Sequence, residues 1–309
     1  MAERPAFKAL TLGAPASALV RKTQRNAPFN QASIAAVFRS VFYVRLAGDM
    51  LCVTTVDVGD GPISARTNAR CDWQRTGLRV GQPVSLTPKL LSVAGLIDVD
   101  LSTAQIWQPA LIGTTGTSEN MRAGLNRLRR HLAGGDRMAG LGAFLSPEFR
   151  LPATDVFLRL TAPKISAASL WMAAAMHGRK DLVPDWAVSL LGAGPGLTPS
   201  GDDFLGGALI ALHAIGRARV AETLWHQIAP HLSERTNDIS GALLKAAALG
   251  HGSAAIHTAI AALSGDDPTA LPPALAAMDR IGHSSGWDTL LGVVTVLDAR
   301  VAAHRRRAA

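Results

Sequence analysis

The stretch that decides the fold is SVFYVRLAGDMLCVTTVDV, residues 40–58. Two runs rich in β-branched and aromatic residues, Ser40–Leu46 and Met50–Val58, flank the short segment Ala47-Gly48-Asp49. Glycine in such a segment accepts the positive φ angle that tight turns require. We therefore expect the two runs to form a β-hairpin, which the segment Gly59–Pro62 then ends.

Further short apolar runs follow this hairpin, and Gly, Pro and Asp separate them. Strands at such regular spacing are typical of a small sandwich or barrel. We expect strands in Pro62–Thr67, Pro83–Leu86, Gly95–Leu101 and Ala104–Trp107, and a short helix around Gln31–Arg39 before the hairpin.

From about residue 115 the sequence favours helices. Their interiors are rich in Ala and Leu, and many begin after Ser, Thr, Asp or Asn, which cap free amide groups. The expected helices are Ser118–Leu132, Ser166–His177, Asp203–Ile215, Arg219–Ala229, Ile239–Ala248, Ser253–Leu263, Pro272–Arg280 and Trp287–His304. Residues 109–117 form a plausible linker. The prediction is an α+β chain: residues 1–112 as a small β-sandwich or barrel-like domain, and residues 113–309 as a mainly α-helical domain.

Composition narrows the classes of protein. The 309 residues are 48% hydrophobic and 17% charged, which suits a large core. No apolar stretch reaches the roughly 20 residues of a membrane span, and the N-terminus lacks the pattern of a signal peptide. With only Cys52 and Cys71, a reduced cytoplasmic setting is expected. The net charge of +8 comes mainly from scattered arginines and aromatics are 5%, so we expect no nucleic-acid partner.

The most informative segment for function is LLGAGPGLTPSGDDFLGG, residues 190–207. Glycines there let backbone amides face a ligand, and the following helix adds free N–H groups that favour an anion. It is not a Walker A loop, because the Gly-Lys-Ser/Thr ending is missing. The candidate substrate-binding residues of this loop are Gly194, Gly196, Thr198, Ser200 and Gly201.

Two adjacent carboxylates, Asp202 and Asp203, follow these donors. One of them can simply cap the helix, but each carboxylate makes ionisation of the other less favourable, so the pair needs a further reason. Holding Mg²⁺, binding a substrate N–H and acting as a general base all remain open. Donors beside carboxylates suit a substrate with anionic oxygens and amide N–H groups, such as a ureido acid or carbamoyl compound.

Two more polar loops lead into helices, residues 235–240 (RTNDIS) and residues 282–288 (GHSSGWD). A purely structural role explains each loop about as well as a functional one. In the first loop that role is capping of the following helix, and in the second it is a tight connection between two helices. If the three loops meet at one end of a bundle, they form a pocket. The additional candidate residues are Arg235, Thr236, Asn237, His283, Ser284 and Ser285.

Other combinations of reactive residues are weak. His251 and His257 have no Cys or acidic partner at a metal-binding spacing, so no metal site is expected from them. Ser200 does not stand in a Gly-x-Ser-x-Gly elbow, which argues against a serine hydrolase.

The run GPGLTPSGDDFL, residues 194–205, resembles the signature of a bacterial family, long catalogued only as a domain of unknown function, that includes the AllH-type subunit of oxamate carbamoyltransferase. The later runs TNDIS (236–240) and GHSSG (282–286) are similar to accompanying motifs of that family, as are residues 40–42 and 61–62.

This resemblance implies a role in the breakdown of allantoin and other ureido compounds in purine degradation, in which oxalurate and phosphate give oxamate and carbamoyl phosphate. It further implies an assembly with an FdrA-like subunit and a second large subunit. Within that chemistry, Asp202 or Asp203 would accept the ureido N–H or transfer its proton. Arg235 would pair with a carboxylate, and His283 would act in proton transfer.

The leading hypothesis is therefore a subunit of a carbamoyl-transferring enzyme, with no certain cofactor. One alternative is a non-catalytic binding or scaffold subunit of the same assembly. A second alternative is a phosphotransferase that holds Mg²⁺ at Asp202 and Asp203.

Overall fold

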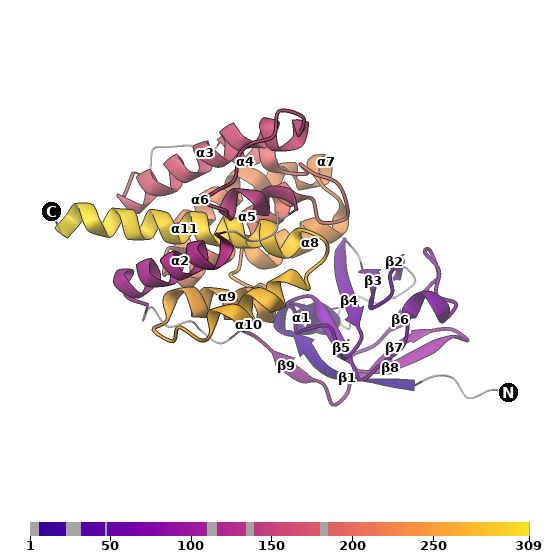
Figure 1. Cartoon of the computed structure of the whole chain (residues 1–309). Helices are drawn as coiled ribbons and strands as arrows, with labels where there is room; N and C mark the ends of the chain where they lie inside the picture. Colours follow the sequence, from indigo (N-terminus) through magenta and orange to yellow (C-terminus); the bar gives the residue numbers. More distant parts are fainter. Residues whose placement is uncertain are drawn as a thin grey trace. The chain divides into compact units, whose positions relative to one another are not determined.

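The computed structural model divides the chain into two compact units, residues 1–109 and residues 110–309 (Figure 1). The first is a curled β-sheet that forms a half-barrel, and the second is helical, so the α+β prediction is confirmed. The described residues are 6–22, 32–46, 48–109, 116–133, 139–179 and 185–308. Most of the predicted linker, residues 110–115, lies outside them.

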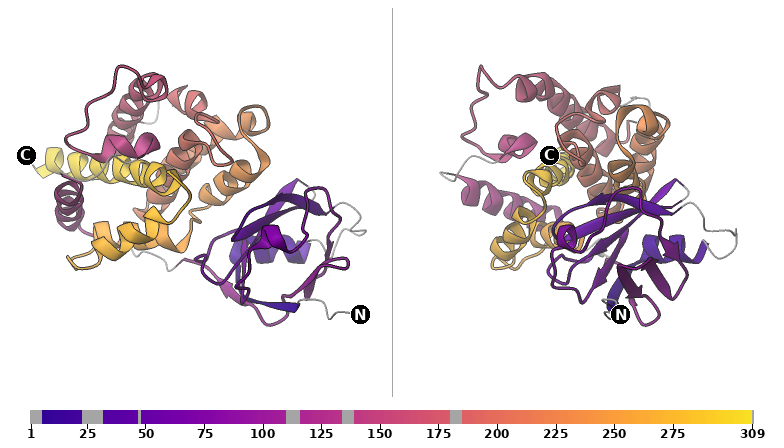
Figure 2. Two further views of the ribbon diagram at one scale, coloured as in Figure 1. Left: turned by 45° about the vertical axis from the view of Figure 1, so that its right-hand side comes forward. Right: turned by 90° about the vertical axis from the view of Figure 1, so that its right-hand side faces the viewer.

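The sheet contains nine strands in the order β2-β3-β4-β5-β1-β8-β7-β6, with β9 paired to β1. Its curl is visible in Figure 2. The strands are β1 Ala6–Gly13, β2 Ser33–Val37, β3 Val41–Leu46, β4 Asp49–Thr54, β5 Ser64–Thr67, β6 Ser85–Leu86, β7 Leu90–Val93, β8 Ile97–Asp100 and β9 Gln105–Trp107. The predicted hairpin is confirmed, because β3 and β4 pair antiparallel from Val41 opposite Thr54 to Leu46 opposite Asp49.

The predicted helix around Gln31–Arg39 is wrong. Residues Ser33–Val37 form strand β2, which pairs antiparallel with β3. The alanines of this segment are compatible with a helix, but backbone pairing with the neighbouring hairpin determines the structure. Strand β1 was not predicted either, although it lies inside the sheet and pairs with β5, β8 and β9.

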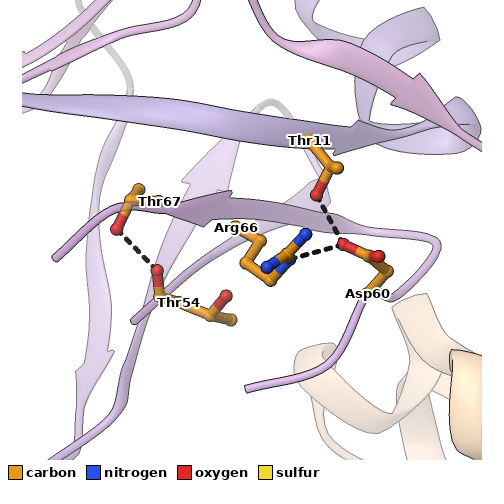
Figure 3. Close-up of polar contacts among 5 residues, drawn as sticks. All are labelled: Thr11, Thr54, Asp60, Arg66 and Thr67. Carbon is orange, nitrogen blue, oxygen red and sulfur yellow. Dashed lines mark hydrogen bonds and ion pairs between the residues drawn. The ribbon is translucent and has the colours of Figure 1, made fainter. Parts of the chain in front are cut away.

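Two groups of residues hold the sheet together. Trp73 is fully buried, and its ring meets Phe7 and Phe42 edge-on, with ring centroids 5.2 and 5.1 Å away. At the edge of this core, Asp60 Oδ1 accepts hydrogen bonds from Thr11 Oγ1 at 2.5 Å and Arg66 Nε at 2.7 Å (Figure 3). The loop after the hairpin is thereby tied to both β1 and β5.

All eight predicted helices occur: α2 has the predicted bounds, and the other seven have shifted ends. Helix α3 begins ten residues earlier than expected, because Asp155 caps it and Pro163 is accommodated within it. The short helices α4 and α7 were not predicted. The helices are α1 Ala14–Lys22 in the first unit and, in the second, α2 Ser118–Leu132, α3 Val156–Met176, α4 Asp185–Leu190, α5 Ser200–Ala214, α6 Ala218–Ile228, α7 Leu232–Arg235, α8 Asp238–Ala247, α9 Ala254–Ser264, α10 Leu271–Asp279 and α11 Ser285–Ala308.

The centre of the helical unit is the crossing of α5 and α11. Glycines bring the two backbones into contact: a Cβ on Gly207 would lie 2.0 Å from the carbonyl oxygen of Thr289. A Cβ on Gly292 would likewise lie 2.0 Å from the carbonyl oxygen of Phe204. This close crossing fixes the first turns of both helices relative to each other. In the described ranges, no helix is both long and apolar enough to cross a membrane.

Candidate functional site

The three polar loops singled out in the sequence meet at the N-termini of α5, α8 and α11. Asn237 Nδ2, before α8, donates a hydrogen bond to the carbonyl oxygen of Leu197 at 2.9 Å. Thr198 Oγ1 lies 2.7 Å from Ser285 Oγ, in the first turn of α11, and either hydroxyl can donate. The loop before α5 is therefore bonded to both of the other loops.

Asp202 is the structural centre of this arrangement and is only 2% exposed. Its Oδ1 accepts the backbone N–H of Gly192 at 2.7 Å, and its Oδ2 accepts the hydroxyls of Ser240, at 2.7 Å, and Thr236. Burial raises the pKa of Asp202, and the three hydrogen bonds oppose that rise. Both carboxylate oxygens are already engaged, so Asp202 acts chiefly as a joint between the loops.

Gly192 explains how that joint closes. Its φ is +73°, in the left-handed region that favours glycine. A Cβ at this position would lie 1.8 Å from the carbonyl oxygen of Arg235, so any side chain would push the two loops apart.

Asp203 differs from its neighbour. Burial raises the pKa of Asp203 well above its ordinary value. Hydrogen bonds from the hydroxyls of Ser285 and Thr198 oppose the rise, while the negative charges of Asp288 and Asp202 add to it. Its Oδ2 is shielded from solvent and has no hydrogen-bond partner among the described residues. These conditions favour the neutral carboxylic acid, which can donate a proton.

Asp288 is a third buried carboxyl, and its part in the site was not predicted from the sequence. It is fully buried, and its Oδ1 accepts the backbone N–H of Gly142 at 3.0 Å. Burial raises its pKa, and hydrogen bonds from Ser200 and Ser284 oppose the rise. The sequence did contain a signal for its place in the site: Asp288 stands four residues after Ser284, in the first turn of a predicted helix. Ser240 was missed too, although it stands four residues after Thr236.

The backbone amides of the glycine-rich loop fall into two groups. Gly201 N–H donates to the carbonyl oxygen of Ala193 at 2.8 Å, so it is not available to a ligand, contrary to what its position in the sequence suggests. The N–H groups of Gly194, Gly196 and Thr198 have no hydrogen-bond acceptor in the described part of the chain. The outer half of the loop therefore keeps free donors.

Two candidate residues lie at the surface. The side chains of Arg235 and His283 are exposed, and neither makes a hydrogen bond or ion pair with any described residue. Thr236 and Asn237, by contrast, are engaged within the protein, since Asn237 Oδ1 accepts the N–H groups of Ile239 and Ser240 and so caps α8.

No three His, Cys, Asp or Glu side chains lie together as a possible metal site in the ranges that the structure covers. The Mg²⁺ alternative stays a prediction. A groove of about 370 Å³ lies between α2, α3 and α11, and it shares no residue with the three loops.

Two family models match the chain, one in each of the two units. The fold defines the class of the protein: it has two units, one of β-strands and one of helices, and the helical unit carries the three converging loops. A sequence model described as oxamate carbamoyltransferase subunit AllH matches residues 190–297, which contain all three loops. A model described as the AllH family N-terminal domain matches residues 8–106. The chain belongs to the AllH family. No solved structure matches it.

Proposed function

We propose that this chain is a catalytic subunit of an oxamate carbamoyltransferase, and that the three converging loops form its reaction site. The reaction takes oxalurate and phosphate to oxamate and carbamoyl phosphate. Membership of the AllH family supports the class of enzyme. The observation that carries the assignment of the site is the contrast between Asp202, whose oxygens are both engaged, and Asp203, which keeps an unpartnered oxygen.

In the proposed step, a phosphate oxygen attacks the ureido carbonyl carbon, and the bond from that carbon to the imide nitrogen breaks. The leaving nitrogen needs a proton to depart as the amide of oxamate. Asp203 in its neutral form donates that proton and regains one from the attacking hydrogen phosphate, so atoms and charges balance. A carboxyl whose pKa is raised by burial is suited to this role at neutral pH.

The free N–H groups of Gly194, Gly196 and Thr198 would bind the phosphate or the developing oxyanion. Arg235 is exposed close to the same loops and would pair with the substrate carboxylate. His283, in the loop before α11, would act in proton transfer. Ser284 and Ser285 would orient Asp288 and Asp203 through their hydroxyls.

The proposal includes an FdrA-like subunit and a second large subunit as partners, in purine and allantoin breakdown in the cytoplasm. A scaffold role for this chain is the competing proposal, in which the loops bind a partner protein and the reaction takes place elsewhere.

Reconstitution of the three subunits tests the proposal, with carbamoyl phosphate formation from oxalurate and phosphate as the readout. We expect Asp203→Asn to lower turnover by about 100-fold or more, as loss of a general acid does, while the assembly keeps its mass. Asp266→Asn removes an exposed carboxylate outside the loops and serves as the matched control. Full turnover in Asp203→Asn would remove that carboxyl from the chemistry and favour the scaffold role.

A further inference from the structure

One face of helix α3 is apolar and exposed to solvent. Val156, Leu160 and Leu170 are 65%, 63% and 73% exposed. Apolar residues recur along this face in alternating steps of four and three, the spacing that produces a straight contact seam between two helices. This α3 stripe consists of Val156, Leu160, Pro163, Ala167, Leu170 and Ala174; its two alanines are half-buried, and Ala167 also packs against the core.

The opposite face of α3 is already buried. Leu158, Ile165 and Met172 belong to the core of the helical unit, in which α3 packs against α4 and α11. Figure 1 shows α3 along the edge of that unit. A helix that is apolar on both faces is normally covered on both. The α3 stripe is therefore a surface without a partner within the described part of the chain.

We propose that the α3 stripe is the contact between two copies of this chain, with the two α3 helices antiparallel. If the pairing centres on Ile165, Leu160 of each copy meets Leu170 of the other. The small residues Pro163 and Ala167 then meet at the centre, where the helices approach most closely, and Val156 meets Ala174. The stripe is thus complementary to itself under a twofold axis, as a symmetric dimer requires.

Charges at the ends and flanks favour the same pairing. Asp155 caps the start of α3, and His177 follows its end, so antiparallel helices place the carboxylate of one copy near the imidazole of the other, which can donate a hydrogen bond to it. Lys164 Nζ donates a hydrogen bond to the carbonyl oxygen of Ser189 in the same copy at 2.9 Å, so its ammonium group already has a partner. A parallel pairing would instead place Arg159 of both copies together, and the two Lys164 likewise.

The family comparison favours a second copy over another subunit as the occupant. Helix α3 lies within residues 107–189, outside both matched ranges. A surface that binds a partner shared across the family is expected within the matched ranges. A second copy always carries the same stripe.

Light scattering on the full chain tests this proposal. We expect twice the chain mass of 32.3 kDa at micromolar concentration. The double variant Leu160→Glu/Leu170→Glu should have the mass of a single chain, with an unchanged far-UV circular dichroism spectrum. Leu249→Glu is the matched control, because Leu249 is 69% exposed in the same unit but lies outside α3. A single-chain mass for the unchanged protein, or a dimer that survives the double substitution, would overturn the proposal.

Cysteine cross-linking tests the direction of the helices. In a Cys71→Ser background, the remaining Cys52 is buried, and burial raises the pKa of its thiol to about 12, which keeps it unreactive. The double variant Leu160→Cys/Leu170→Cys should cross-link into dimers, whereas each single variant should not. Efficient cross-linking of either single variant would indicate a parallel contact and contradict the antiparallel pairing.

Discussion

Ser240 Oγ donates a hydrogen bond to Asp202 Oδ2 at 2.7 Å, which joins the first turn of α8 to the first turn of α5. The same carboxylate accepts the N–H of Gly192 and the hydroxyl of Thr236. One buried side chain therefore holds two of the three candidate loops together, residues 190–207 and residues 235–240.

We expect Asp202→Ala to lower the free energy of unfolding by about 3 kcal/mol, because it leaves the buried hydroxyl of Ser240 and the half-buried donors of Gly192 and Thr236 without their acceptor. Ser240→Ala removes one bond and should lower it by about 1 kcal/mol. Urea unfolding of the full chain measures both. If Asp202→Ala were as stable as the unchanged protein, the hydrogen bonds of Asp202 would have no structural role.

The crossing of α5 and α11 gives a second prediction, with an internal control. Gly292→Ala should lower the free energy of unfolding by about 3 kcal/mol, because the new Cβ would lie 2.0 Å from the carbonyl oxygen of Phe204 and separate the helices. Gly206→Ala lies in the same helix pair, but its Cβ would be 3.9 Å from the nearest side chain. It should raise stability by up to about 1 kcal/mol, because alanine favours helix. Equal effects of the two substitutions in thermal or urea unfolding would contradict this account of the crossing.

Local sequence signals predicted much of the fold. The hairpin of β3 and β4 was predictable because its two runs and its turn are adjacent in sequence. Strand β2 was predicted as a helix because its alanines are compatible with one, although it pairs with the neighbouring strand β3. Strand β1 was missed because its partners β5, β8 and β9 lie far along the chain. Parallel pairing of β1 with β8 joins residues about 90 positions apart in sequence, which no local pattern reports.

The candidate site was predictable at the level of its loops. Gly, Ser, Thr and Asp at helix starts identified all three. The different environments of Asp202 and Asp203 were not predictable, because successive helical residues point about 100° apart and the burial of each depends on tertiary packing. Asp288 acquires its environment from Gly142, which is 146 positions away in sequence.

The raised pKa of Asp203 makes stability depend on pH in a defined direction. Since the folded state binds this proton more tightly than the unfolded state, Asp203 contributes stability at low pH that is lost as pH rises through the folded pKa. The neutral amide of Asp203→Asn has no such loss. We therefore expect the variant to become more stable relative to the unchanged protein between about pH 5 and about pH 8. Urea unfolding at both pH values measures this difference, and a constant difference would show that Asp203 ionises as freely in the folded state as in the unfolded state.

His257 should produce the opposite pH dependence. Burial lowers its pKa from 6.5 to about 4, with a smaller effect from the neighbouring His251, and its Nε2 accepts the N–H of Gly252 at 3.0 Å. The stability that depends on its neutral ring is fully present above the unfolded pKa and is lost as pH falls from 6.5 toward 4. A shift of this size corresponds to about 3 kcal/mol. His257→Gln cannot titrate in this range, so the difference between the unchanged protein and the variant isolates this contribution from those of the buried carboxyls. Urea unfolding in steps of pH should show that difference shrinking on acidification, and a profile shared by both proteins would indicate that His257 keeps an ordinary pKa.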